Sequence, residues 1–228
     1  MNQISILTGL IGIIGTLLGV ILGAFLNYII LKSQYKVQKF NYYLEQAINW
    51  SKNGQKPSLR KANLQGADLS GLDFGASQNE ENGIDLSFSD LRKTDMSNCR
   101  LVNANIQKSI LRKAILSDSD LSSANLFRAD LRKADLTRTN LNGVDLREAD
   151  LTGATMKDAD FSNALLANTI LKNTNLENAL FVNANLYAAN LENANISNEQ
   201  LSRAETYNEA KLRNKKISLK KIKAFLRR

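Results

Sequence analysis

Histidine is absent from this chain of 228 residues, and cysteine and proline each occur once. Histidine is the commonest general base at neutral pH and the commonest protein ligand of metal ions, so both roles lose their usual residue. The lone cysteine, Cys99, has no partner for an intramolecular disulfide or for a paired-cysteine metal site. We therefore expect no metal site and no cofactor, and a reducing, cytoplasmic location fits the cysteine usage.

Positive charge is scarce in the middle of the chain, although the net charge of the whole is +8. The segment from Ala62 to Glu199 carries thirteen basic and nineteen acidic residues, a net charge of −6. Residues 32–61 carry a net charge of +6, and residues 200–228 carry +8. A mildly acidic middle is thus flanked by two basic segments, and this asymmetry requires an explanation of its own.

Charged residues are also absent between Ile4 and Leu31, a run dominated by Ile, Leu, Gly and Val. A helix needs about 20 apolar residues to cross the hydrocarbon core of a bilayer. A cleaved signal peptide would have basic residues before the run and a small-residue cleavage site after it, and this run has neither. We therefore predict a retained, single-pass transmembrane helix. Because Lys32, Lys36 and Lys39 follow the run, the N-terminus is expected outside and the rest of the chain in the cytoplasm.

Three glycines within this run recur at every fourth residue: Gly15, Gly19 and Gly23. Such a stripe lets two membrane helices approach closely, and it predicts a homodimer through the transmembrane helix. The alternative is that glycine is simply frequent in transmembrane helices.

Residues 32–57 are predicted to continue as a juxtamembrane amphipathic helix followed by a linker. The apolar residues Val37, Phe40, Leu44 and Ala47 follow helical spacing along one face. We expect this helix to cover the first end of the next domain. Pro57 and the preceding Asn-Gly pair should end it.

A large apolar residue occupies every fifth position from Leu86 to Leu201, with a small residue two positions before it and usually Asp or Asn between them. A helix would spread such leucines around its axis, and a single strand would alternate them between its two faces. The chain must therefore turn once in every repeat. Four five-residue sides close a coil of 20 residues, and successive coils stack at about the 4.8 Å spacing of strands.

Runs such as Ala124-Asn125-Leu126 and Ala129-Asp130-Leu131 resemble the A-(D/N)-L-x-x consensus of pentapeptide-repeat proteins. The resemblance implies an all-β domain, a right-handed quadrilateral β-helix over residues 58–203. It also implies a bacterial source, with a plasma or thylakoid membrane for the anchor. The spacing of twelve between Phe74 and Leu86 breaks the period by two, so a loop is expected within residues 75–85.

Candidate binding residues on this rod are outward-facing cations that recur at intervals of 20. Such a ladder can mark an anion-binding face, or its side chains can simply extend into solvent beside Asp90, Asp130 and Asp150. The ladder consists of Arg92, Arg112, Arg132, Lys93, Lys113 and Lys133. The recurring Asp and Asn residues are interpreted as turn formers, and Cys99 as a core residue. No nucleophile and base occur with a recognisable spacing, so no small-molecule substrate and no enzymatic activity are expected.

The C-terminal segment, residues 204–228, is predicted to form a short basic amphipathic helix. It can cap the last coil, contact anionic lipid, or do both. The lipid-contacting cations would be Lys215, Lys216, Lys220, Lys221, Lys223, Arg227 and Arg228.

The sequence thus predicts an anchor at residues 1–31 and a membrane-tethered scaffold that presents its rod to a protein partner. One alternative follows from the resemblance, because some pentapeptide-repeat proteins bind topoisomerases by mimicking DNA. That role needs a strongly acidic surface, and the basic ladder argues against it. A second alternative is an organiser of anionic lipids. Tethering at a membrane argues against a nucleic-acid partner.

Overall fold

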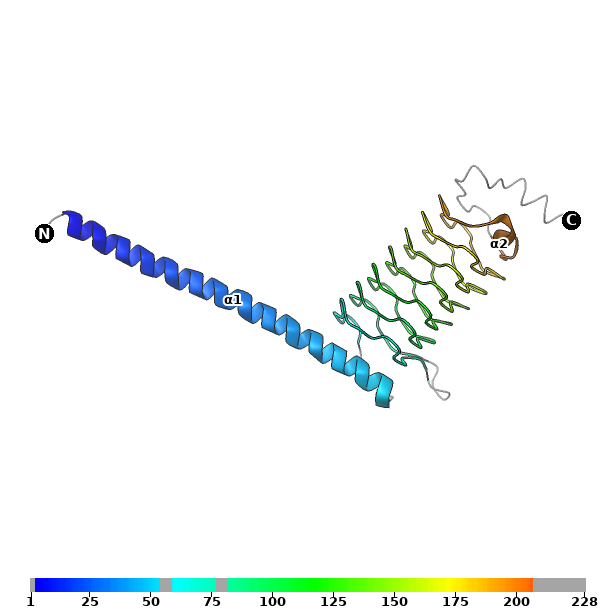
Figure 1. The fold of residues 1–228 in the computed structure, drawn as a ribbon, viewed down its shortest axis with the longest axis horizontal. Coiled ribbons are helices and arrows are strands. Elements are labelled where there is room, and N and C mark those ends of the chain that lie inside the picture. Colours follow the sequence, from blue (N-terminus) through cyan, green and yellow to red (C-terminus); the bar gives the residue numbers. More distant parts are fainter. Residues whose placement is uncertain (1–2, 54–58, 77–81, 207–228) are drawn as a thin grey trace. The chain divides into compact units, whose positions relative to one another are not determined.

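The computed structural model describes residues 3–53, 59–76 and 82–206, with the side chains of residues 3–21, Trp50 and Asn53 outside that description. The chain divides into two compact units, Met1–Tyr42 and Tyr43–Arg228. The first unit is helical, and the second contains a stack of coils (Figure 1).

Helix α1 runs without interruption from Gln3 to Asn53. The anchor and the juxtamembrane helix predicted from the sequence are thus parts of one helix. Its last residues precede Gly54 and Pro57, which favour a break at that place. In the described part of the chain, no helix is both long and apolar enough to cross a membrane. Of the predicted span, only residues 22–31 have described side chains.

The end of α1 belongs to the second unit and contacts its first coil. Ala47 is completely buried there. The Ser51 hydroxyl oxygen accepts a hydrogen bond from the backbone N–H of Asp73 at 2.9 Å. The end of a stacked solenoid leaves backbone groups without a neighbouring coil, and Ser51 satisfies one of them.

Parallel β-bridges join each coil of the second unit to the next. Asp90 pairs with Ile110 and Ile110 with Asp130, so equivalent residues lie 20 positions apart. Since one side takes five residues, the coil has four sides. Each side is a single bridged residue, and the described ranges contain no longer strand. The predicted β-helix is therefore present with sides shorter than ordinary strands.

The bridges define four faces, which we number in chain order. Face 1 contains Asn63, Asp90, Ile110, Asp130, Asp150, Ile170 and Asn190. Face 2 contains Asp68, Asp95, Ile115, Asp135, Thr155, Asn175 and Asn195. Face 3 contains Asp73, Arg100, Asp120, Asn140, Asp160 and Leu180. Face 4 contains Asp85, Asn105, Asn125, Asp145, Leu165, Asn185 and Thr206. We name the edges by the faces they join, so the 4/1 edge lies between faces 4 and 1.

In the described coils, apart from the edge between Asp73 and Asp85 and the one after Asn195, each edge is a tight turn that follows the large apolar residue. At the 1/2 edge, the carbonyl of Leu91 accepts a hydrogen bond from the N–H of Thr94, and Lys93 between them has a φ of 58°. This left-handed conformation at the third residue is that of a type II turn. Asn and Gly tolerate it best, which explains their frequency at this position.

The core consists of the leucines and alanines that the sequence pattern assigned to it. Leu91, Leu111 and Leu131 are fully buried above one another, and Ala114 and Ala134 fill the narrower neighbouring column. Face 3 also contributes three buried phenylalanines, Phe74, Phe161 and Phe181. Burial of these side chains between coils is the main stabilising term, at about 25 cal/mol per Å².

The irregular spacing before Leu86 is an insertion of seven residues. Asn63 pairs with Asp90 at a separation of 27, whereas later pairs are separated by 20. The insertion lies where the chain passes from face 3 to face 4, between Asp73 and Asp85. The sequence showed only that the period is broken by two, and an insertion of seven residues gives the same break because seven and two leave the same remainder on division by five. Residues 77–81 of the predicted loop lie outside the described ranges.

Helix α2 spans Asn198–Ser202 and replaces the last predicted five-residue unit. It begins with a capping box, in which Ser197 and Gln200 bond each other's backbone N–H groups. Leu201 points from this helix into the core and is fully buried. The chain then returns to face 4, where Thr206 pairs with Asn185.

Candidate functional site

Two of the predicted contact regions lie outside the described part of the chain. The cationic tail beyond residue 206 is one of them, and the surroundings of Gly15 and Gly19 are the other. The third glycine of the stripe, Gly23, is described, and a Cβ atom there would meet nothing within 4 Å. Dimerisation and lipid contact by these segments stay predictions.

The recurring Asp and Asn side chains are turn formers, as predicted. The Asp95 carboxylate accepts a hydrogen bond from the N–H of Ser97 at 3.0 Å and another from its hydroxyl at 2.7 Å. Asn125 accepts one from the N–H of Phe127 at 3.0 Å. These oxygens hold the edges in place. In the described ranges, no three acidic or cysteine residues come together as a metal-binding group.

Cys99 is buried in the core, in the small-residue column where the sequence placed it. Its Sγ donates to the carbonyl of Leu69 at 2.9 Å. Burial raises the pKa of the thiol to about 11. Because the thiolate is the reactive form, this cysteine is a structural residue and a poor nucleophile.

The three predicted arginines lie one above another on the 1/2 edge, and all three turn back onto carboxylates of face 1. Arg92 donates two hydrogen bonds to Asp90, at 2.8 and 2.6 Å. Arg132 does the same with Asp130, at 2.8 Å each, and Arg112 contacts the same Asp130 at 2.5 Å. The bonds from Arg92 hold the pKa of Asp90 below its ordinary value, while partial burial opposes that effect.

The three predicted lysines behave differently. Lys93, Lys113 and Lys133 are exposed at the turn position of the same edge, with φ values of 58°, 60° and 59°. Within the described residues none of them has an ion pair. Stacked coils place the backbones of these three turn residues in a row at about the 4.8 Å spacing of strands.

A second basic row, not predicted from the sequence, lies along the 4/1 edge. Arg60 lies over the ring of Phe88, 4.8 Å from its centroid, and the Lys108 amine lies 5.3 Å from the same centroid. Higher on this edge, Arg128 lies 4.9 Å from the ring centre of Phe127. The ring of Phe88 holds Arg60 and Lys108 in place, whereas Arg128 also pairs with Glu148 at 2.7 Å. A correct count of the insertion would have revealed this row, because Lys61 and Phe88 are 27 residues apart.

Together these rows border face 1 on both sides. We call face 1 with its 4/1 and 1/2 edges the basic face. The arginines of this face are ion-paired, with Asp90, Asp130, Asp145 or Glu148, apart from Arg60. Among the described residues of the rod, the cations without an ion pair are Arg60, Lys61, Lys93, Lys108, Lys113 and Lys133. All six are on the basic face.

Acidic side chains gather on the opposite side. Faces 2 and 3, with the 2/3 edge between them, carry nine of them: Asp68, Asp73, Asp95, Asp118, Asp120, Asp135, Asp158, Asp160 and Glu177. Only Asp73, Asp118 and Glu177 of these are in ion pairs, with Arg100, Arg138 and Lys157. The rod is therefore basic on one side and acidic on the other.

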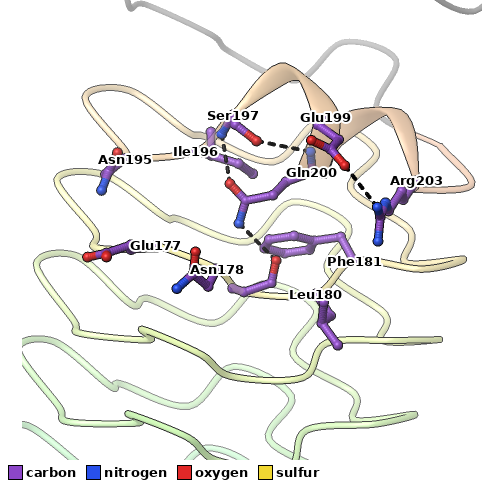
Figure 2. A pocket seen from close by; sticks show the side chains of 11 residues that line it. Glu177, Asn178, Leu180, Phe181, Asn195, Ile196, Ser197, Glu199, Gln200 and Arg203 are labelled. Atoms are coloured by element: carbon purple, nitrogen blue, oxygen red, sulfur yellow. Dashed lines mark hydrogen bonds and ion pairs between the residues drawn. The ribbon is translucent and has the colours of Figure 1, made fainter.

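A hollow of about 470 Å³ lies at the end of the rod beside α2. Figure 2 shows Gln200 at its centre, pointing from α2 toward the last coil. The Gln200 amide donates to the carbonyls of Leu176 and Ala179 at 2.7 and 2.8 Å. Arg203 pairs with Glu199 at 2.9 Å. These groups already serve the cap, so we take the hollow as part of the rod's end and the basic face as the candidate functional site.

Comparison with known proteins agrees with this fold. A family model described as "Pentapeptide repeats (8 copies)" matches residues 82–118, 119–158 and 159–198, just over half of the chain. The curated proteins contain no match. The chain is 23% identical to HetL of the cyanobacterium Nostoc sp. strain PCC 7120, a protein involved in the regulation of heterocyst differentiation. That match covers 70% of this chain and 90% of HetL, with a TM-score of 0.33.

Two further solved structures are similar. QnrB1, a plasmid-mediated fluoroquinolone resistance protein, is 20% identical over 66% of this chain and 74% of its own, with a TM-score of 0.39. Another pentapeptide repeat protein from Nostoc PCC 7120 is 32% identical over 41% of this chain and 77% of its own, with a TM-score of 0.38.

Proposed function

The chain belongs to the pentapeptide-repeat family, and on this basis we propose that it is a non-enzymatic, membrane-tethered scaffold. Its β-helix rod would be presented to a protein partner at the cytoplasmic face of a bacterial plasma or thylakoid membrane. The separation of charge around the rod is the observation that carries the proposal. Repeat proteins bind partners through extended surfaces, and this rod has a basic face and an acidic side.

The tether is supported by the sequence and by the exposure of α1. The run from Ile4 to Leu31 has no charged residue. Within its described part, Phe25, Ile29 and Leu31 are exposed by 57%, 45% and 64%. Such large apolar side chains need lipid or protein to cover them. Lys32 and the basic residues that follow would hold the next segment in the cytoplasm.

The scaffold role is supported by how the rod uses its polar groups. The carboxylates and amides of the faces hold turns, and many arginines bond neighbouring carboxylates. The described residues thus form straight rows of charged side chains, and few of their polar groups are left over for a catalytic site. The topoisomerase-binding alternative requires a strongly acidic, DNA-like surface. The acidic side of this rod also carries Arg100, Arg138 and Lys157, and the basic face lies across the rod from it.

Membrane fractionation of point variants tests the tether. Ile13→Lys together with Val20→Lys places two charges in the middle of the run, where each is costly in hydrocarbon. The wild-type chain should stay in the membrane fraction after washing at high salt and at alkaline pH, and this variant should not. Ser33→Lys with Gln34→Lys adds the same charge beyond the run and should behave like the wild type. A wild-type chain that washes into the supernatant would overturn the tether.

Crosslinking in cells tests the scaffold. The wild type and the Ile13→Lys/Val20→Lys variant should capture the same protein partner if the rod is the binding element. Variants that reverse charges on the acidic side, such as Asp95→Lys with Asp135→Lys, should lose it. A partner that is retained by these rod variants and lost with the tether would show that the rod is not the binding surface.

A further inference from the structure

Within the part of the rod that the structure describes, the unpaired cations all lie on the basic face. Arg60, Lys61 and Lys108 lie on the 4/1 edge, and the Lys93, Lys113 and Lys133 row lies on the 1/2 edge. The two rows run parallel along the axis on either side of face 1. The 3/4 edge, by contrast, has no charged residue at its described turn positions. All the other cations among the described residues of the rod are in ion pairs. The positive field of unpaired cations in this part of the chain therefore comes from the basic face.

These lysines occupy positions that do not favour them. The third residue of each turn has a left-handed φ, which costs energy for an L side chain and which Asn and Gly tolerate best. The described turns of the other two edges hold mostly Asn and Gly at this position, but no lysine. The exceptions there are Asp118, Ser123, Arg138 and Asp158. The five lysines with a left-handed φ are Lys61, Lys93, Lys108, Lys113 and Lys133. Strained residues that gather on one surface are typical of a functional constraint.

Exposed apolar side chains share this face with the cations. Phe88 and Ile110 are each 38% exposed among the lysines, and Ile170 is 36% exposed further along face 1. Tyr187, at the far end of the 4/1 edge, is 44% exposed. Cations mixed with apolar and aromatic side chains are typical of surfaces that lie at the interface of an anionic bilayer.

We infer that the basic face docks on the anionic phospholipid headgroups of a bilayer, so that the rod lies on its side and turns its acidic faces toward the cytoplasm. This inference rests on the proposed function for where the rod is held, because the tether would keep it near a leaflet; the docking itself is carried by the charge of the basic face. It assigns a separate task to each side of the rod. The basic face binds the lipid surface, and faces 2 and 3 remain open to a protein partner.

A fluorescence experiment on the full-length chain measures this orientation. A fluorophore is attached at Gln107→Cys on the 4/1 edge or, in a second sample, at Ser117→Cys on the 2/3 edge. Both positions are half-exposed turn residues, and Cys99 is buried and does not compete for the label. The chain is reconstituted in phosphatidylcholine vesicles with or without about 30% phosphatidylserine, together with a lipid whose headgroup carries a quencher.

Docking predicts that quenching at residue 107 is at least about twofold stronger in anionic than in neutral vesicles, and that about 0.5 M salt abolishes the difference. The label at residue 117 should give the same weak quenching in both. Equal quenching at residue 107 in the two kinds of vesicle would overturn the inference. The inference would also be overturned if the chain bound a single-stranded DNA oligonucleotide while neither kind of vesicle quenched its label.

Two variants locate the effect. Lys93→Asn/Lys113→Asn/Lys133→Asn removes the 1/2 row with residues that suit the turn, so the rod should remain folded and lose the extra quenching. The second variant adds Asn98→Lys, Asn103→Lys and Asn178→Lys to these changes. The total number of lysines is then the same as in the wild type, but three of them lie on the 2/3 and 3/4 edges, at positions with φ values of 57°. It should also fail to dock, and docking by this transposed variant would contradict the inference.

Failure of the tether gives a different result from failure of the docking. A chain that stays with vesicles at high salt but shows no selective quenching is tethered without docking. A chain that is removed by salt but is quenched selectively at low salt docks without a tether, which leaves the inference standing and overturns the anchor.

Discussion

The rings of Phe161 and Phe181 lie one above the other in consecutive coils of face 3, with centroids 5.2 Å apart and planes 4° from parallel. Both side chains are almost fully buried. This stack occurs in a column that elsewhere holds leucines, such as Leu121 and Leu141. The two flat rings pack face to face between neighbouring coils.

The first prediction concerns this stack. Phe161→Ala removes the ring from a closed core and should lower the free energy of unfolding by about 3–5 kcal/mol. Phe161→Leu restores the repeat consensus and should cost about 1 kcal/mol. Urea denaturation followed by circular dichroism measures both. An alanine variant as stable as the leucine variant would show that the column can collapse around the lost ring.

The second prediction concerns the turn lysines. Lys113→Asn exchanges a residue with a φ of 60° for one that tolerates that conformation, and should raise the free energy of unfolding by about 0.5 kcal/mol. The reciprocal change Asn98→Lys should lower it by a similar amount. Chemical denaturation of the two single variants gives both values. If both changes destabilise the rod, contacts of the lysine side chain outweigh the conformational energy of its left-handed backbone.

The third prediction concerns the cap. Gln200→Ala leaves the carbonyls of Leu176 and Ala179 without their donor and should cost about 1–3 kcal/mol. Glu199→Ala removes only an exposed ion pair with Arg203 and should change stability by less than about 0.5 kcal/mol. Thermal melting compares the two, and equal losses would mean that Gln200 has no special role.

The fourth prediction concerns acid. The pKa of Asp90 is below its ordinary value in the folded chain because Arg92 donates hydrogen bonds to the carboxylate. Its contribution to stability is therefore present above the unfolded pKa of about 3.9 and is lost as the pH falls through the lower folded value. Asp90→Asn should flatten the fall in melting temperature between about pH 5 and pH 2.

The matched control for the acid experiment is Asn125→Ala. Asn125 occupies the equivalent turn position on face 4 and accepts a hydrogen bond from the N–H of Phe127. Its removal should lower the melting temperature by the same amount at every pH, because the amide does not titrate. An Asp90→Asn curve parallel to this one would show that Asp90 carries no pH dependence.

The fifth prediction concerns Cys99. Since the pKa of its thiol is raised to about 11 by burial, almost no thiolate exists in the folded chain at pH 8. A thiol reagent should react with the wild type only after addition of denaturant. Ser97→Cys, at a half-exposed turn position, should provide a thiol that reacts at once. Rapid reaction of native wild-type chain would indicate that the coil opens around Cys99.

The fold could be predicted from the sequence because a period of five excludes both helix and strand. The column of Leu91, Leu111 and Leu131 follows directly from that period. The end of the rod could not be located in the same way. Leu201 keeps the spacing of five but lies in α2, since a coil and a short helix can bury the same side chain. The capping box of Ser197 and Gln200 was the available signal.

The candidate site could be predicted only in part. Repetition at 20 residues was enough to place Lys93 above Lys113. It could not show that Arg92 and Arg132 would bond Asp90 and Asp130, because those contacts depend on how an edge side chain turns over a face. The 4/1 row was hidden by the insertion, which shifts Lys61 relative to Phe88.

That insertion has a consequence for engineering. Face 1 keeps its register across it, with Asn63 opposite Asp90, as if the seven extra residues were absent. The register between coils is set by the pairing of their sides, and it does not depend on the number of residues in the edge between two sides. Foreign peptides such as epitopes or protease sites could therefore be introduced at the 3/4 edge of later coils, near Ser123 or Gly143, and displayed at chosen heights along the rod.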